Sequence, residues 1–134
     1  MKSRSASGGM KIEGKRMPEI DRMTNTALLD NDPILAEIVR RLVQEFHPAR
    51  VFLFGSRARG EATEGSDYDL LVVMPIMEGP GYRLAQQAHR QAFRGIPVPI
   101  DVVFFTEKKF DERKTVIGSL PETAMHEGKE LYVA

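Results

Sequence analysis

Hydrophobic positions recur at helical spacing between residues 33 and 46. The segment follows Asp32, a residue type that often caps helix N-termini, and it has proline at its first position. Its apolar residues would form one face of a helix, with polar residues on the other: Ile34, Leu35, Ile38, Val39, Leu42, Val43 and Phe46. We therefore predict an amphipathic helix that begins at Pro33 and is stopped by Pro48.

Three short apolar runs predict strands. They are "RVFLFG" at 50–55, "DYDLLVVM" at 67–74 and "VPIDVVFF" at 98–105. Helical spacing returns over 82–93, and residues 107–134 predict one or two short helices closed by the apolar "LYV". This alternation predicts an α/β or α+β sandwich around a small sheet.

Composition narrows the class of protein. The 134 residues are 42% hydrophobic and 28% charged, the range of a single soluble domain, and no apolar run approaches a membrane span. The absence of cysteine fits a cytoplasmic location. The net charge is zero, but the first sixteen residues are basic and the remainder mildly acidic, which argues against bulk nucleic-acid binding. Residues 1–24 are interpreted as a flexible N-terminal extension and 25–134 as the folded domain.

Two aspartates at the start of an apolar run are the residues that say most about function. Asp67 and Asp69 are two residues apart, so on a strand they share a face with α-carbons roughly 6.5–7 Å apart. Asp101 lies in the third predicted strand, and one register would bring all three together. Such a cluster suits a hard divalent cation, Mg²⁺ above all, while the lack of nearby histidine or cysteine disfavours zinc. Singly, each aspartate could instead cap a turn, pair with an arginine or lie at an edge.

A second feature, Gly55-Ser56, lies at the predicted strand-to-helix junction. Free backbone amides there could bind an anion, although Ser56 could equally be an ordinary N-cap. Arg57 and Arg59 could assist in binding phosphate, but on a short helix they alternate sides, so at most one would face a ligand. The segment fits neither a Walker A loop nor a dinucleotide fingerprint. A phosphate site beside metal-binding carboxylates indicates phosphoryl or nucleotidyl transfer.

The spacing Gly-Ser-x10-Asp-x-Asp, from Gly55 to Asp69, resembles the signature of the DNA polymerase β-like nucleotidyltransferase superfamily, and in particular its minimal nucleotidyltransferases. The resemblance covers roughly 33–133 and implies a mixed, mainly antiparallel sheet backed by helices, with the active site on the open sheet face. It implies that Asp67, Asp69 and Asp101 bind two Mg²⁺ ions, for which Mn²⁺ could substitute. It also implies that Asp101 helps to deprotonate the acceptor hydroxyl, and that Gly55 and Ser56 hold the triphosphate.

The leading hypothesis is that the protein transfers a nucleoside monophosphate to a hydroxyl group and releases pyrophosphate. The favoured donor is ATP, from which AMP would be transferred. Minimal members of the family often work beside a HEPN-type partner as a toxin–antitoxin pair, so the acceptor could be a partner protein and a homo-oligomer could complete the acceptor surface. The alternative hypothesis is an antitoxin-type binding module that neutralises a HEPN-like partner mainly by contact.

Overall fold

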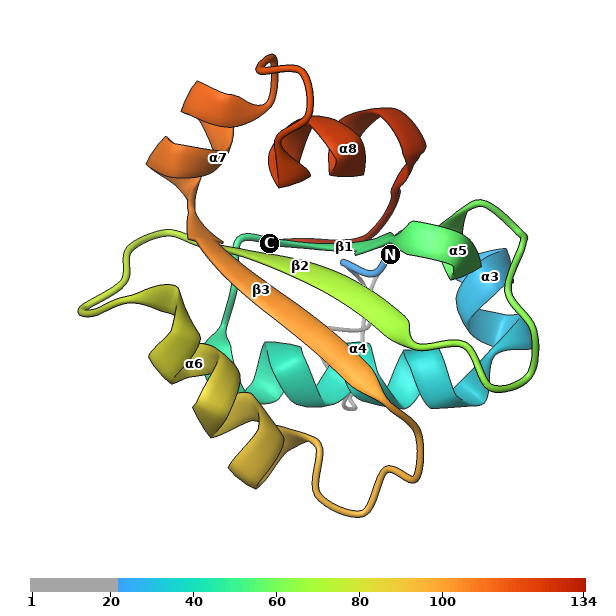
Figure 1. Cartoon of the computed structure of the whole chain (residues 1–134). Coiled ribbons are helices and arrows are strands. Elements are labelled where there is room, and N and C mark those ends of the chain that lie inside the picture. The colour runs from blue at the N-terminus through green and yellow to red at the C-terminus, as the bar shows by residue number, and fades with distance from the viewer. Residues whose placement is uncertain (1–21) are drawn as a thin grey trace, which may run out of the picture.

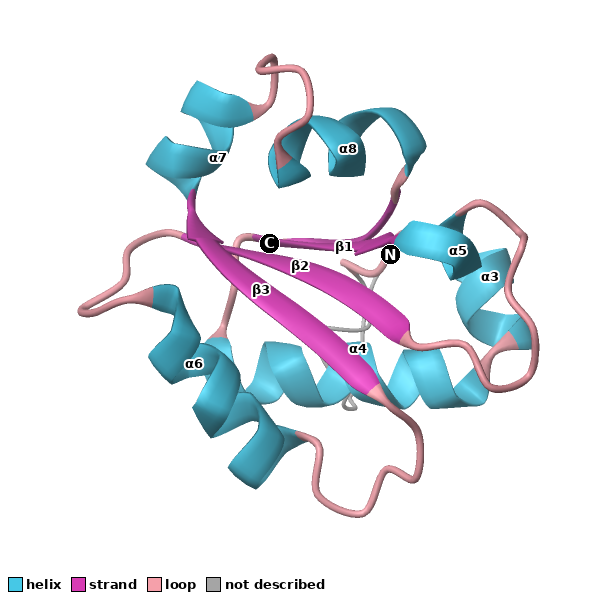
Figure 2. Ribbon diagram, in the orientation of Figure 1, coloured by secondary structure: helices cyan, strands magenta, loops and turns pink. Residues whose placement is uncertain are grey.

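The computed structural model describes residues 22–134 (Figure 1). Four strands form one sheet, with helices on both sides (Figure 2). In chain order the elements are α3 (Thr26–Asn31), α4 (Pro33–Phe46), β1 (Arg50–Phe54), α5 (Gly55–Ala58), β2 (Tyr68–Met74), α6 (Gly81–Gln87), the π-helical turn η1 (Ala88–Ala92), β3 (Ile100–Thr106), α7 (Glu107–Arg113), α8 (Leu120–Glu127) and β4 (Lys129–Val133).

The sheet is mixed. Its strand order is β3-β2-β1-β4, with β1 antiparallel to both β2 and β4 and with β2 parallel to β3. Parallel neighbours need a crossover connection, and α6 with η1 supplies it. The predicted α+β class and the mixed, mainly antiparallel sheet are confirmed.

Helix α4 forms as its sequence pattern predicts. The Asp32 side chain accepts a hydrogen bond from the Leu35 amide at 3.0 Å, and Pro33 occupies the first turn. The apolar stripe of α4 packs, together with α6 and η1, on one face of the sheet (Figure 1). The Phe46 and Phe104 rings meet edge to face there, with their centroids 4.9 Å apart. This face holds the larger hydrophobic core.

Helices α7 and α8 lie on the opposite face of the sheet (Figure 1). They cover a smaller core made by Phe52, Leu71, Val73, Phe110 and Ala124. The Phe52 and Phe110 rings are stacked with centroids 5.4 Å apart. The sheet face that the family resemblance implied to be open is therefore partly covered.

Several boundaries differ from the sequence predictions. Helix α3 was not predicted, and β2 begins at Tyr68, so that Asp67 precedes the strand. Gly55, the last residue of the run predicted as a strand at 50–55, begins helix α5, which is only one turn long. The final "LYV" belongs to a true strand, β4.

Residues 22–24 run beside β4. Met23 forms an antiparallel bridge with Tyr132, and the Thr24 amide donates to the Leu131 carbonyl at 2.9 Å. The interpretation of 1–24 as a flexible extension otherwise falls on residues 1–21, which lie outside the described residues. In the part of the chain that is described, no helix has the length and apolar character to cross a membrane.

Candidate active site

The strand registers bring two of the predicted carboxylates side by side. Asp69 on β2 pairs with Asp101 on β3, and on its other side it pairs with Phe54 of β1. Adjacent strands lie about 4.8 Å apart, so these three residues form one row across the sheet. Alternation along β2 puts Asp69 on the same face as Leu71 and therefore on the α7/α8 side.

The third carboxylate, Asp67, belongs to the same electrostatic group. Burial raises the pKa of Asp69 above its ordinary value, and the negative charges of Asp101 and Asp67 raise it further. The positive charge of Arg59 acts in the opposite direction. Asp67 and Asp101 are exposed and Asp69 is half-buried, so the group opens to solvent.

The carboxylates are not closed into a cage. Among residues 22–134 no three acidic, histidine or cysteine side chains are grouped closely enough to hold a metal ion as they stand. The convergence of all three aspartates on a metal therefore stays a prediction. The donor set fits a hard divalent cation nonetheless, because it consists of carboxylate oxygens whose mutual repulsion a cation would relieve.

Gly55 lies directly against Asp69. Its φ of 75° belongs to the left-handed region, and a Cβ added there would come within 2.2 Å of Asp69 Oδ2. Glycine tolerates this conformation without a steric cost, and it alone leaves room for the carboxylate. The turn that ends β1 and the carboxylate row are thus one structural unit.

Ser56 does not act as a helix cap. The N-cap position of α5 is Phe54, which makes no side-chain capping bond, and Ser56 is the second residue of the helix. The capping alternative for Ser56 is therefore wrong. Its backbone carbonyl accepts from the Glu61 amide at 2.9 Å, which folds the chain back after α5.

The two arginines of the turn point to different partners. Arg57 donates from Nε and Nη2 to the Ser66 carbonyl, at 3.0 and 2.7 Å, and lies over the Tyr68 ring. Arg59 donates from Nε to Glu61 at 2.9 Å, and its Nη1 lies 3.3 Å from a carboxylate oxygen of Glu127 on α8. Of the two, only Arg59 acts on the pKa of Asp69.

Sequence reasoning missed two contacts around the site. The Tyr68 hydroxyl donates to both carboxylate oxygens of Asp32, at 2.9 and 3.0 Å, and burial with this acidic neighbour raises the pKa of Tyr68 to about 12. Glu127 reaches Arg59 from the far end of the chain. Neither contact has a local sequence signal, since both join residues distant in the sequence.

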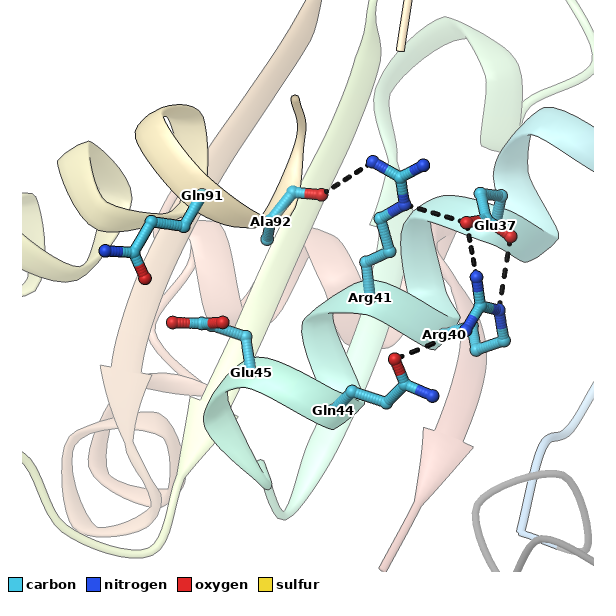
Figure 3. A pocket seen from close by; sticks show the side chains of 7 residues that line it. All are labelled: Glu37, Arg40, Arg41, Gln44, Glu45, Gln91 and Ala92. Atoms are coloured by element: carbon cyan, nitrogen blue, oxygen red, sulfur yellow. Dashed lines mark hydrogen bonds and ion pairs between the residues drawn. The ribbon is translucent and has the colours of Figure 1, made fainter. Parts of the chain in front are cut away.

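A separate pocket lies away from the carboxylates, between α4 and η1 (Figure 3). Glu37, Arg40, Arg41, Gln44, Glu45, Gln91 and Ala92 line it. Glu37 forms ion pairs with both Arg40 and Arg41, so these charged side chains of the pocket are paired with one another. We assign no substrate to this pocket.

Two carboxylates on adjacent strands beside a glycine turn suit metal-assisted transfer of phosphate groups. A model of the nucleotidyltransferase domain family matches residues 34–124, a range that contains the turn and all three aspartates. The chain belongs to this family of nucleotidyltransferases.

A solved structure with similarity to this chain is that of a candidate nucleotidyltransferase from Sulfolobus solfataricus. It is 28% identical in sequence, with a TM-score of 0.49, and the alignment covers 74% of this chain and 83% of that one. No curated protein matches the sequence significantly.

Proposed function

We propose that the protein transfers a nucleoside monophosphate, AMP from ATP in preference, to a hydroxyl acceptor and releases pyrophosphate. The observation that carries this proposal is the pairing of Asp69 with Asp101 in the β2–β3 register, with the Gly55 backbone packed against Asp69. The family match supports nucleotidyl transfer in general, and the nucleotide and the acceptor are part of the proposal.

Asp67, Asp69 and Asp101 would hold Mg²⁺, or Mn²⁺ in its place. When bound, a pair of such ions neutralises charge on the phosphates and lowers the pKa of the acceptor hydroxyl. Support comes from the oxygen-only donor set and from the raised pKa of Asp69, which a bound cation would bring down.

The remaining roles, phosphate binding and proton transfer, fall to residues of the chain. Gly55 and Ser56 would hold the β- and γ-phosphates, and Arg59, whose positive charge lowers the pKa of Asp69, would assist them. In the transfer, the acceptor oxygen forms a bond to the α-phosphorus and the bond from that phosphorus to the bridging oxygen breaks. Pyrophosphate leaves with the electron pair of that bond, and Asp101 takes the proton of the acceptor hydroxyl.

The acceptor in this proposal is a protein hydroxyl on a HEPN-type partner. Its support is the resemblance of the Gly55–Asp69 segment to minimal nucleotidyltransferases. The exposed position of Asp101 is compatible with a macromolecular acceptor, since a hydroxyl on another protein could approach it.

The test is incubation with ATP, GTP, CTP or UTP labelled at the α-phosphate, with Mg²⁺ or with EDTA, and with a co-encoded partner or lysate. We expect a labelled product that requires Mg²⁺, favours ATP and is lost in Asp69→Asn. Asp111→Asn is the matched control, because Asp111 pairs with Lys114 on the surface of α7. Absence of label from all four nucleotides would contradict the proposal.

A second assay distinguishes nucleotidyl transfer from the alternative hypothesis, in which the protein neutralises a partner mainly by contact. If Asp67→Ala with Asp69→Ala still neutralises a partner as well as the wild type does, nucleotidyl transfer is not how the protein acts on that partner. If neutralisation is lost while the two proteins still bind, transfer is required.

A further inference from the structure

Arg57 is bound to the loop that leads into Asp67. Its Nε and Nη2 atoms donate to the Ser66 carbonyl at 3.0 and 2.7 Å, and Nη2 lies 3.5 Å from the Glu64 carbonyl. Ser66 is the residue immediately before Asp67. The guanidinium therefore fixes the peptide group from which Asp67 extends.

The loop over residues 61–66 is closed on itself and on α5. The Thr63 amide donates to the Ser66 hydroxyl at 2.9 Å, and the Ser66 amide donates to the Thr63 carbonyl at 3.1 Å. At its other end, the Glu61 amide donates to the Ser56 carbonyl. This leaves Arg57 as the side chain that ties the second half of the loop back to α5.

The other side of Arg57 rests on a fixed platform. Its guanidinium carbon lies 3.9 Å from the centroid of the Tyr68 ring, and Tyr68 is only 3% exposed. The Tyr68 hydroxyl donates to Asp32, and Asp32 in turn caps α4. A continuous set of contacts thus runs from the N-terminus of α4 to the peptide before Asp67.

We propose that Arg57 is a positioning residue: it acts through the Ser66 carbonyl to set where Asp67 stands relative to Asp69 and Asp101, and it does not contact the substrate phosphates. This inference rests on the proposed function for its consequence in catalysis. Mg²⁺ demands near-ideal octahedral geometry, and a misplacement of about 1 Å in a catalytic group can cost about 100-fold in rate. A loop ligand therefore needs such a support.

The two contacts of Arg57 also predict that lysine cannot replace it. Arginine presents two donors in a rigid plane to one carbonyl and stacks that plane on an aromatic ring. Lysine would keep the positive charge but lose the two-donor fork and the planar stacking on the Tyr68 ring. A charge role and a positioning role thus predict different results for Arg57→Lys.

The experiment compares Arg57→Gln, Arg57→Lys and Arg59→Gln with the wild type. Four quantities are measured: amide hydrogen exchange over residues 61–67, affinity for Mn²⁺ alone from the loss of its free-ion EPR signal, and the kcat and KM for the nucleotide. For both Arg57 variants we expect faster exchange in the loop, weaker Mn²⁺ binding and a kcat lowered about 10- to 100-fold, with KM little changed. For Arg59→Gln we expect mainly a raised KM.

Arg41→Gln is the matched control. Arg41 also donates to backbone carbonyls, that of Ala92 (Figure 3) and that of Arg94, but it does so on the α4/η1 side, away from the carboxylates. We expect its loop exchange, Mn²⁺ affinity and kcat to stay at wild-type values. If Arg57→Gln does not fold, Arg57→Lys is measured in its place.

Three outcomes would overturn the positioning role. They are a raised KM with unchanged loop exchange in Arg57→Gln, full rescue of kcat by Arg57→Lys, and a wild-type protein that does not bind Mn²⁺. A wild type that binds Mn²⁺ but transfers no nucleotide would contradict the proposed function alone. Loop exchange and Mn²⁺ affinity would then still support or overturn the role of Arg57.

Discussion

The two faces of the sheet differ in what their residues do. On the α4 side, Val51, Leu53, Leu70 and Val72 pack in the larger core with the stripe of α4. On the α7/α8 side, β1 and β2 contribute to a smaller core at one end, and β2 and β3 contribute Asp69 and Asp101 at the other. Stability is therefore expected to depend mainly on the first face, and chemistry on the uncovered end of the second.

The largest expected effect concerns the α4 side of the sheet, which holds the larger core. Leu42 on α4 is fully buried, and Leu42→Ala should lower the free energy of unfolding by about 2–5 kcal/mol because it leaves a cavity. The control is Ile117→Ala in the loop between α7 and α8, where the isoleucine is 91% exposed and a change within about 0.5 kcal/mol is expected. Denaturant titration measures both. Equal losses would contradict the division between the faces.

The second-largest expected effect concerns the α7/α8 side of the sheet, which carries Asp69 and Asp101. If Asp101 has the proposed roles of metal ligand and proton acceptor, Asp101→Asn should lower kcat by more than about 100-fold, near 2.7 kcal/mol of transition-state stabilisation. Asp101 is exposed, so the free energy of unfolding should change by less than about 0.5 kcal/mol. Steady-state kinetics beside denaturant titration checks this separation. A variant that loses both activity and stability would show that the two faces are not independent.

Gly55→Ala should affect both properties, because Gly55 joins the fold to the site. The left-handed φ should cost about 1–3 kcal/mol in the free energy of unfolding, and the new methyl group would displace Asp69 and lower kcat. Gly60→Ala is the control, since Gly60 shares a positive φ but has nothing within 4 Å of an added Cβ. The control should show the backbone cost without the loss in kcat. Equal activity in the two variants would mean that the close approach to Asp69 is not needed.

The smallest effect concerns pH. The pKa of Asp69 is raised in the folded chain, so stability falls as pH rises from the unfolded value, about 3.9, through the folded value. The penalty is fully present only at pH values above the folded pKa. In EDTA, Asp69→Asn should therefore unfold at a higher temperature than the wild type at about pH 7, with a gain that shrinks toward about pH 4. A less stable variant at neutral pH would contradict the raised pKa.

The sequence predicts much of the fold because its signals are local. The cap at Asp32, the apolar stripe of α4 and the short apolar runs each give an element that the structure confirms. Helix α3 was missed because it is short, and among its six residues only Leu29 is buried, so it has little periodic pattern. Its place depends on packing against α4 rather than on its own sequence.

The candidate site divides in the same way. The spacing of Asp67 and Asp69 is visible in the sequence, and the register that pairs Asp69 with Asp101 was one alternative among several. Arg57 and Arg59 point in different directions. The sequence predicted only that at most one of them would face a ligand. Their actual partners, Ser66 and Glu127, depend on how the loop and α8 fold back, which no local pattern encodes.

The parallel pairing of β2 with β3 has a consequence for how this protein could be engineered. The paired aspartates are joined through a connection that leaves the sheet after Met74, passes along the α4 side and returns at Ile100. Their alignment is fixed by strand pairing, so the length of that connection does not set it. The exposed tip at Glu78–Pro80 is therefore a point where a fluorescent domain could be inserted while both carboxylates stay in register.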